Sequence, residues 1–295
     1  MNASFESNRL ILVYTPNHLG EALDLLGKNP DALIYAGGTD ILAKQTTRMP
    51  VFGRQIISLR RVEELQQMKR YEGFVEIGAA VSLGEILRRK EARFLPPIVK
   101  HAIQSIGTPA LRNTATIGGN LAVADRKLLL LPVLLILDSF MEVRSRQSTR
   151  FLEIKRFLDE NNTVRLQPGE IITKIRIPTG RFNLFGFSTL PGCVIRTQDY
   201  FMMCYVARKN RSVLEKINFA FNIDGRHIVR IKQSEDRLIG KKMPLIPNEI
   251  REEVRFFEAK IEARLPLLPV YKKERIVNYF RLMLTQELNR VVFSE

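Results

Sequence analysis

Residues 106–122 read Ile-Gly-Thr-Pro-Ala-Leu-Arg-Asn-Thr-Ala-Thr-Ile-Gly-Gly-Asn-Leu-Ala, and the glycine pair at 118–119 is the most informative feature of the chain. A second pair lies upstream, in the run Ala36-Gly37-Gly38-Thr39-Asp40. Paired glycines allow positive φ and let backbone N–H groups approach a ligand closely. Successive N–H groups bind anions, and threonine and asparagine add further donors. We therefore predict two loops that bind one long diphosphate ligand from two sides.

Each glycine pair taken alone is also compatible with an ordinary tight turn. Neither stretch continues into Gly-Lys-Ser/Thr, and neither has the G-x-G-x-x-G spacing, so the common P-loop and dinucleotide-binding motifs are excluded. The prediction therefore depends on what surrounds the two pairs.

Five segments, in matching order along the chain, resemble the FAD-binding subunits of molybdopterin hydroxylases. This family includes the medium subunit of carbon monoxide dehydrogenase and the FAD domain of xanthine dehydrogenase. The segments are residues 36–42, 77–86, 106–122, 168–178 and 271–276. The resemblance implies an α+β fold, with a two-lobed FAD-binding domain of the vanillyl-alcohol-oxidase (PCMH) type followed by a smaller α+β C-terminal domain. The implied domains are residues 1–178, with lobes at about 1–60 and 61–178, and residues 179–295.

The resemblance also implies which residues hold FAD in the cleft between the first two lobes. The diphosphate would lie on the backbone of residues 37–40, with residues 116–120 on its other side and apolar side chains around the flavin. The implied set is Ile34, Tyr35, Ala36, Gly37, Gly38, Thr39, Asp40, Ile41, Ile106, Thr116, Ile117, Gly118, Gly119, Asn120, Ala122, Asp125 and Ile172. For the hydrophobic members, packing in the core is the competing interpretation.

Two positions depart from the family pattern. Leu129 stands where relatives usually have an acid that reaches the cofactor, and Asp125, four residues earlier, is the candidate replacement. Ser188 follows Phe187 where many relatives place a lysine close to the flavin. These departures keep a second hypothesis open, in which the chain retains the fold as a scaffold and binds FAD weakly or not at all.

By the resemblance, electrons would pass from a large molybdopterin subunit through a small 2Fe-2S subunit to FAD, and then to NAD or another acceptor. A flavin subunit needs no acid/base pair of its own, because the cofactor carries the electrons. The two cysteines, Cys193 and Cys204, and three histidines do not suggest a metal site in this chain. The implied partners are therefore the large and small subunits.

The composition is that of a globular protein, with 295 residues of which 45% are hydrophobic. The first residues lack a signal-peptide pattern, and the apolar run at 128–137 is too short to span a bilayer, so we expect a cytoplasmic protein without a membrane partner. The net charge of +15 leaves open an acidic partner or, remotely, nucleic acid. Neither a basic stripe with stacking aromatics nor a helix-turn-helix pattern is found, so nucleic-acid binding is not predicted.

Periodicity and cap residues predict a small β-α-β-β lobe, a mixed lobe and an antiparallel sheet with two closing helices. The expected strands are 9–14, 33–36, 56–59, 74–77, 140–144, 171–177, 182–187, 200–208 and 216–222. The expected helices begin at Pro16 after a Thr15 cap, at Ser82, at Pro97 and near 128, and after an Asn248 cap, with a last helix through Ile276 and Leu284. Ser82 and Glu85 form a capping-box pattern.

Overall fold

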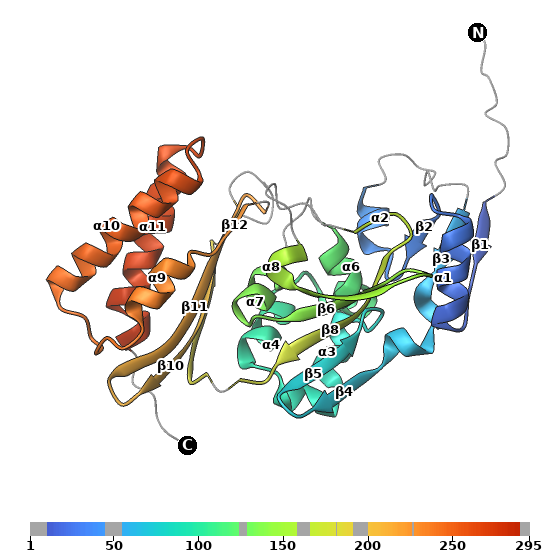
Figure 1. Ribbon diagram of the computed structural model, residues 1–295, viewed down its shortest axis with the longest axis horizontal. Coiled ribbons are helices and arrows are strands. Elements are labelled where there is room, and N and C mark those ends of the chain that lie inside the picture. The colour runs from blue at the N-terminus through green and yellow to red at the C-terminus, as the bar shows by residue number, and fades with distance from the viewer. Residues whose placement is uncertain are drawn as a thin grey trace, which may run out of the picture.

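The computed structural model describes residues 11–44, 55–123, 129–157, 166–180, 182–190, 200–225 and 227–289. These residues form three sheets that follow one another along an elongated molecule (Figure 1). Each sheet contributes to its own hydrophobic cluster, and the middle cluster also takes side chains from the last sheet.

The N-terminal part is a parallel sheet of order β1-β3-β2 with one long helix. Its elements are β1 (Leu12–Tyr14), α1 (Leu19–Lys28), β2 (Leu33–Tyr35), α2 (Thr39–Ala43) and β3 (Gln55–Ser58). Leu19, Ala22, Leu23 and Leu26 are buried on one face of α1, as their spacing predicts. The predicted helix start at Pro16 is wrong. The Asn17 N–H is bound by the Glu21 carboxylate and the Leu19 N–H by Glu64, so His18 stays extended and becomes the N-cap.

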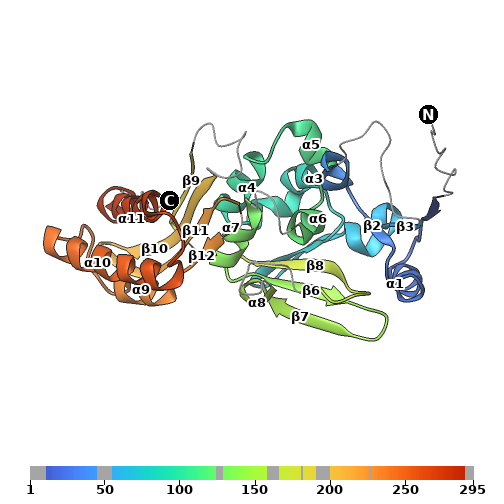
Figure 2. The same cartoon turned by 90° about the horizontal axis from the view of Figure 1, so that it is seen from above.

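The middle part is a five-stranded sheet of order β4-β5-β8-β6-β7 in which all neighbours are antiparallel. Its strands are β4 (Met68–Tyr71), β5 (Phe74–Gly78), β6 (Phe140–Arg144), β7 (Thr149–Glu153) and β8 (Ile171–Pro178). Its helices are α3 (Leu83–Arg88), α4 (Pro97–Gln104), α5 (Pro109–Thr114), α6 (Ile117–Ala122), α7 (Leu130–Ile136) and α8 (Ile154–Phe157). Helices α3 to α7 lie on one face of the sheet, where they bury the middle cluster (Figure 2).

Several details of this part match the sequence patterns, and others do not. Ser82 caps α3 by accepting the Glu85 N–H at 3.1 Å. Helix α7 is buried at every position except Leu135, and Pro132 lies in its first turn, where a missing N–H costs no helical bond. Strands β4 and β7 were not predicted. The expectation of a loop at 116–120 is wrong, because the second glycine pair lies in the first turn of α6.

The C-terminal part is an antiparallel sheet of order β12-β11-β10-β9. Its elements are β9 (Leu184–Thr189), β10 (Phe201–Asn210), β11 (Val213–Ile223), β12 (His227–Val229), α9 (Lys232–Leu238), α10 (Pro247–Arg264) and α11 (Val270–Thr285). Helices α9 to α11 cover one face of this sheet, and α4 and α7 of the middle part cover the other (Figure 1). Strand β10 accordingly alternates between clusters, with Met202 and Cys204 in the middle one and Met203 and Tyr205 in the last.

The cap of α10 also differs from the prediction. Ile246, not Asn248, is the N-cap, because Pro247 occupies the first helical position and the Glu249 carboxylate accepts the Ile246 N–H at 3.0 Å. Val254, Phe257 and Ile261 are buried as expected.

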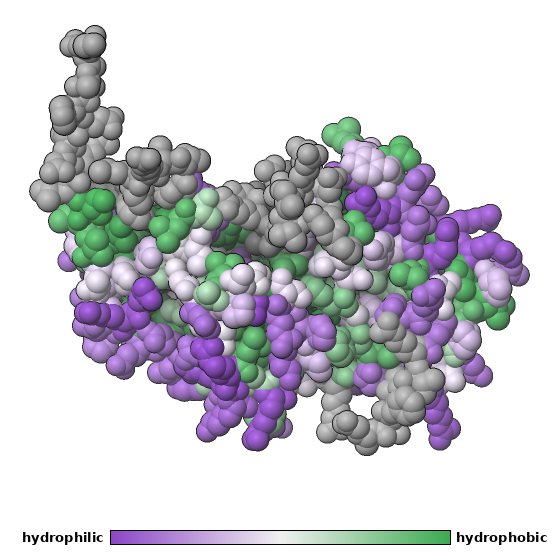
Figure 3. Space-filling view, turned by 180° about the vertical axis from the view of Figure 1, so that it is seen from behind, coloured by the Kyte–Doolittle hydropathy of each residue, from purple (hydrophilic) through white to green (hydrophobic). Residues whose placement is uncertain are grey.

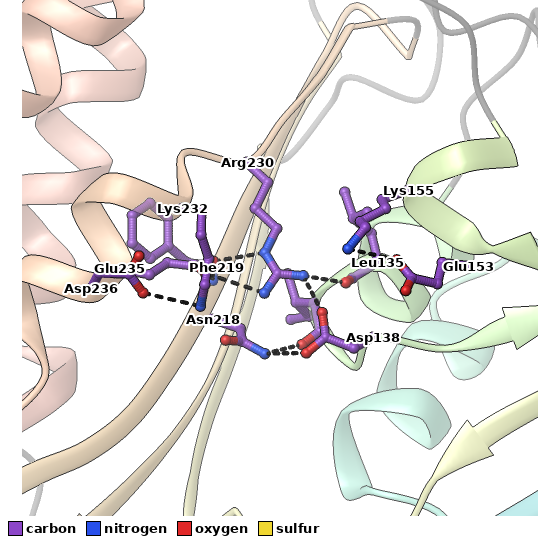
Figure 4. Close-up of polar contacts among 11 residues, drawn as sticks. Leu135, Asp138, Glu153, Lys155, Asn218, Phe219, Arg230, Lys232, Glu235 and Asp236 are labelled. Carbon is purple, nitrogen blue, oxygen red and sulfur yellow. Dashed lines mark hydrogen bonds and ion pairs between the residues drawn. The ribbon is translucent and has the colours of Figure 1, made fainter.

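A polar network joins the middle and last parts (Figure 4). Arg230 donates to the Leu135 carbonyl and to Asp138, at 2.6 Å each, and its Nε donates to Glu235 at 2.8 Å. Burial lowers the pKa of Arg230, but Glu235 and Asp138 more than offset this, so the pKa is raised and the guanidinium stays charged. Asn218 adds a hydrogen bond to the Ile136 carbonyl at 2.6 Å. The end of α7 is thereby fixed against the last sheet.

Among the described residues, no helix is long and apolar enough to cross a membrane.

Candidate functional site: a cleft between two glycine pairs

A cleft of about 400 Å³ lies between the N-terminal sheet and the helical face of the middle part. This volume is in the usual range for ligand sites. The predicted residues that line it are Ile34, Ala36, Gly37, Gly38, Thr39, Asp40, Ile41, Thr116, Gly118, Gly119, Asn120, Ala122 and Ile172. The two glycine pairs, distant in sequence, thus border one space.

The first glycine pair turns the chain from β2 into α2. Gly38 has a φ of +72°, and a Cβ there would collide with the Tyr35 ring, so only glycine fits. Gly37 packs against the carbonyl of Thr114, at the end of α5, and a Cβ would overlap that oxygen. Within the described chain, the N–H groups of Gly37, Gly38 and Thr39 have no hydrogen-bond acceptor. This wall therefore presents backbone donors to whatever fills the cleft.

The second glycine pair has most of its backbone donors already bound. Thr116 caps α6 by accepting the Gly119 N–H at 3.1 Å, and the Gly118 N–H donates to the Ala79 carbonyl at 2.9 Å. A Cβ at Gly118 would strike Ala79, so its small size serves close packing of α6 against the end of β5. The nest predicted here from successive free N–H groups is therefore not formed in this structure.

Gly119 and Asn120 of α6 line the cleft. The space for a Cβ on Gly119 is limited only by the Thr116 hydroxyl, so nothing in the core requires glycine there. The Asn120 Oδ1 atom is buried and has no partner among the described residues. A buried acceptor without a partner is unfavourable, and a ligand that donates to it removes the cost.

The third wall is the start of β8, with Glu170, Ile171 and Ile172. Arg150 on β7 clamps Glu170 with two hydrogen bonds of 2.7 and 2.6 Å, and the Gln167 N–H donates at 2.8 Å. Burial raises the pKa of Glu170, but the hydrogen bonds from Arg150 and Gln167 outweigh it, so the pKa lies below its ordinary value. Glu170 is therefore a fixed anion that holds the strand end in place.

Four predicted residues do not line the cleft or cannot be placed. Tyr35 packs over Gly38, Ile117 is fully buried in the middle cluster and Ile106 packs at that cluster's edge. These three lie outside the cleft lining. Asp125 lies outside the described residues, so its role stays a prediction.

Residues that the sequence reasoning did not assign complete the lining. They are mostly small or apolar: Ala43, Leu59, Ala79, Ala80, Leu111, Ala115, Val123, Leu166, Glu170 and Ile171. Ala79 and Ala80 belong to the quoted 77–86 segment, and Glu170 belongs to the 168–178 segment. Both motifs therefore held a signal for the site. Leu111 and Ala115 likewise belong to the 106–122 segment, whereas Leu166 lies outside the quoted segments.

The two residues that depart from the family pattern, Leu129 and Ser188, do not line the cleft. Leu129 is the N-cap of α7 and packs against the middle cluster, and Ser188 pairs with Met203 in the last sheet.

Comparison with known proteins decides the family. Residues 4–180 match the family described as the FAD binding domain in molybdopterin dehydrogenase. The chain belongs to this family. It is 25% identical over 280 residues to the xanthine dehydrogenase FAD-binding subunit of Escherichia coli O157:H7, covering 94% of this chain and 92% of that protein. It is 23% identical over 296 residues to the nicotinate dehydrogenase FAD-subunit of Eubacterium barkeri, covering 94% and 96%.

A solved structure confirms the fold. The Cu,Mo-CO dehydrogenase superposes with a TM-score of 0.79 at 18% identity, covering 95% of this chain and 98% of that one. The α+β architecture is therefore confirmed. The chain is a flavoprotein subunit of the molybdopterin-dependent oxidoreductase family, with FAD as its cofactor.

The cleft fits this cofactor by its own chemistry. Unpaired N–H groups at Gly37 to Thr39 suit a diphosphate, whereas the unpartnered Asn120 Oδ1 calls for a donor such as a ribose hydroxyl. Ile34 and Ile172 offer apolar surface for rings.

Proposed function

We propose that this chain is the electron-transfer subunit of a molybdenum hydroxylase complex. It would receive electrons from iron–sulfur clusters on a small partner subunit and pass them through FAD to NAD or another acceptor. The observation that carries the proposal is the cleft itself, where unpaired backbone donors face a second wall with an unpartnered amide oxygen.

FAD, when bound, supplies the redox chemistry, and the protein supplies binding, orientation and electrostatics. The residues proposed to hold the diphosphate are Gly37, Gly38 and Thr39 through their N–H groups, with Thr116 opposite. The Asn120 Oδ1 atom on the same opposite wall would accept a hydrogen bond from a ribose hydroxyl. Gly119 would leave room for the ligand backbone to approach α6. The start of β8, held by the Arg150–Glu170 pair, would place Ile172 against the ring system.

The proposed partners are a large molybdopterin subunit and a small 2Fe-2S subunit. The relatives include a nicotine 6-hydroxylase medium subunit from Paenarthrobacter nicotinovorans, 27% identical over 231 residues. Such names fit a chain that works within a multi-subunit enzyme. We also propose that the FAD-binding domain ends at residue 178 and that the C-terminal domain begins at residue 179. The two lobes of the FAD-binding domain would meet at the cleft.

The test is the flavin content of the purified chain. We expect a yellow protein that releases FAD on denaturation and binds added FAD after stripping, measured by quenching of flavin fluorescence. A colourless protein that takes up no FAD would refute the proposal. It would favour the scaffold hypothesis, which is based on the departures from the family pattern at Leu129 and Ser188.

A further inference from the structure

A second groove, which shares no lining residue with the cleft, lies at the outer edge of the five-stranded sheet. It is lined by strand β4 and the 3-10 helix η3 (Lys90–Phe94), with a volume of about 400 Å³. We define the basic groove as Lys69, Arg70, Lys90 and Arg93 around the Phe94 ring. Figure 3 shows strongly hydrophilic side chains along the lower rim of the molecule, where Figure 1 places β4.

The four cations of the basic groove lack carboxylate partners. Within the described parts of the chain, none of them has an ion pair or a hydrogen bond from its side chain. Glu91 is the single acid in the lining. At some other places on the chain, cations share a carboxylate, as Lys174 and Arg176 do at Glu76. The groove therefore carries an excess of positive charge that the fold leaves uncompensated.

The arginines are nevertheless held in place. The guanidinium carbon of Arg70 lies 3.7 Å from the centroid of the Phe94 ring, and that of Arg93 lies 4.7 Å from the same centroid. Cation–π contacts orient both groups at little cost in hydration. Like charges held around one ring repel each other, so an anionic ligand is favoured there over solvent alone.

The surroundings fit a protein chain better than an enclosed small anion. Lys69, Arg70, Tyr71, Lys90 and Arg93 are all exposed, and Tyr71 is 43% exposed beside the groove, stacked on Phe74 at 5.0 Å. Arginine and tyrosine are enriched at the energetic centres of protein interfaces, whereas small-ligand sites are concave and mostly apolar. The cations also come from two adjoining elements, strand β4 and the 3-10 helix η3, which suits an extended acidic segment.

From these observations we propose that the basic groove docks an acidic segment of a partner subunit. The inference rests on the proposed function only in requiring a partner within the complex. Binding of an acidic segment would also account for four of the positive charges that contribute to the net charge of +15. Charge complementarity of this kind speeds association and fixes orientation.

The first experiment measures binding of a fluorescein-labelled deca-glutamate peptide by anisotropy. We compare Arg70→Glu/Arg93→Glu with Lys242→Glu/Arg255→Glu, a control that changes net charge equally at exposed, unpaired sites on the last part of the chain. The groove variant should weaken binding about tenfold, since it reverses two facing charges, and the control should change it less than about twofold. Equal losses in both variants would overturn the proposal.

Inorganic pyrophosphate and a duplex oligonucleotide are measured in parallel at the same salt concentration. Tighter, groove-dependent binding of either one than of the peptide would assign the groove to small anions or to nucleic acid, and would overturn the proposal. Circular dichroism checks the fold of every variant.

The second experiment uses the assembled complex and a carbodiimide, which joins lysine amines directly to carboxylates. Lys69 and Lys90 should form cross-links to aspartates or glutamates of a partner subunit, and Lys69→Arg/Lys90→Arg should lose those cross-links while the complex persists. Cross-links that form only at other lysines would contradict the docking site. Flavin content is recorded throughout, because loss of FAD binding in the wild type would refute the proposed function and leave the groove result unaffected.

Discussion

Gly37 and Gly119 lack side chains for different physical reasons. At Gly37 the neighbour is backbone, the Thr114 carbonyl, so a side chain would push the first lobe away from α5. At Gly119 only the Thr116 hydroxyl is near, and the open side is the cleft. A substitution at Gly37 should therefore disturb both the packing of the first lobe and ligand binding, whereas a substitution at Gly119 should act mainly on ligand binding.

We expect Gly119→Val to lose FAD while the protein stays folded. The added methyl groups would occupy the cleft wall. The Thr116 hydroxyl must move to relieve the contact, which costs its cap hydrogen bond to the Gly119 N–H, about 1 kcal/mol, too little to unfold the protein. Flavin absorbance and circular dichroism, measured on the same sample, report the two properties. Gly20→Val is the matched control, since Gly20 has nothing within 4 Å of its Cβ position. Full flavin occupancy in Gly119→Val would show that α6 does not contact the cofactor.

Asn120 gives a second prediction with opposite effects on two quantities. Asn120→Leu removes the buried Oδ1 acceptor that has no partner in the described chain. The thermal midpoint of the FAD-free protein should therefore stay level or rise, because an unsatisfied polar atom is lost. FAD affinity should fall by roughly tenfold, equivalent to one hydrogen bond of about 1.4 kcal/mol. A variant with a lower midpoint and unchanged affinity would mean that Asn120 is structural.

At the scale of elements, the sequence predicted most of the described strands and the long helices α1, α10 and α11, because apolar periodicity reports directly on burial. It missed the start of α1, strands β4, β7 and β12, and the short helices α2, α5, α6, α8 and α9. Two of these misses have a tertiary cause: Glu64, 45 residues away, accepts the first N–H of α1, and the Ala79 carbonyl accepts the Gly118 N–H in the first turn of α6. Partners so distant in sequence leave no local pattern.

The site could be predicted to a similar extent. Glycine pairs mark close approaches, and so both walls of the cleft were identified. The sequence did not predict that only the first wall offers free N–H groups. This difference depends on the hydrogen bonds that Gly118 and Gly119 donate to Ala79 and Thr116. Leu111 and Leu166 were missed since an apolar residue in a cleft has the same sequence signature as one in a core.

The five-stranded sheet should lose stability in acid. Burial raises the pKa of Glu142, but hydrogen bonds from Thr173 and Arg144 outweigh this and lower it, as Arg150 does for Glu170. A carboxylate with a lowered folded pKa stabilises the protein fully above its unfolded pKa, and this stabilisation is lost as pH falls through the folded value. Thermal midpoints should therefore decline below about pH 4.5. Glu142→Gln should flatten that decline, and an unchanged slope would argue against this cause.

For the whole molecule, Arg230 decides how firmly the middle and last parts are joined. Arg230→Met would leave the fully buried Glu235 carboxylate without its main counter-charge, at a cost of about 3–5 kcal/mol. We expect a lower denaturant midpoint and separate transitions for the two parts, followed by tyrosine fluorescence and circular dichroism. Arg230→Met/Glu235→Leu should recover part of the loss. A single transition at the wild-type midpoint would show that apolar packing alone joins them.

The alternation of β10 between two clusters has a consequence for how this protein can change over evolution. Even-numbered side chains such as Met202 and Cys204 belong to one interior, and odd-numbered ones such as Met203 and Tyr205 belong to the other. Adding or deleting a single residue in the strand would exchange the two sets and mismatch both interiors at once. Substitutions of similar volume are tolerated far better. Lineages of this chain should therefore vary in the identity of the β10 residues while keeping their number fixed, and gain or lose length only in the connections outside the sheet.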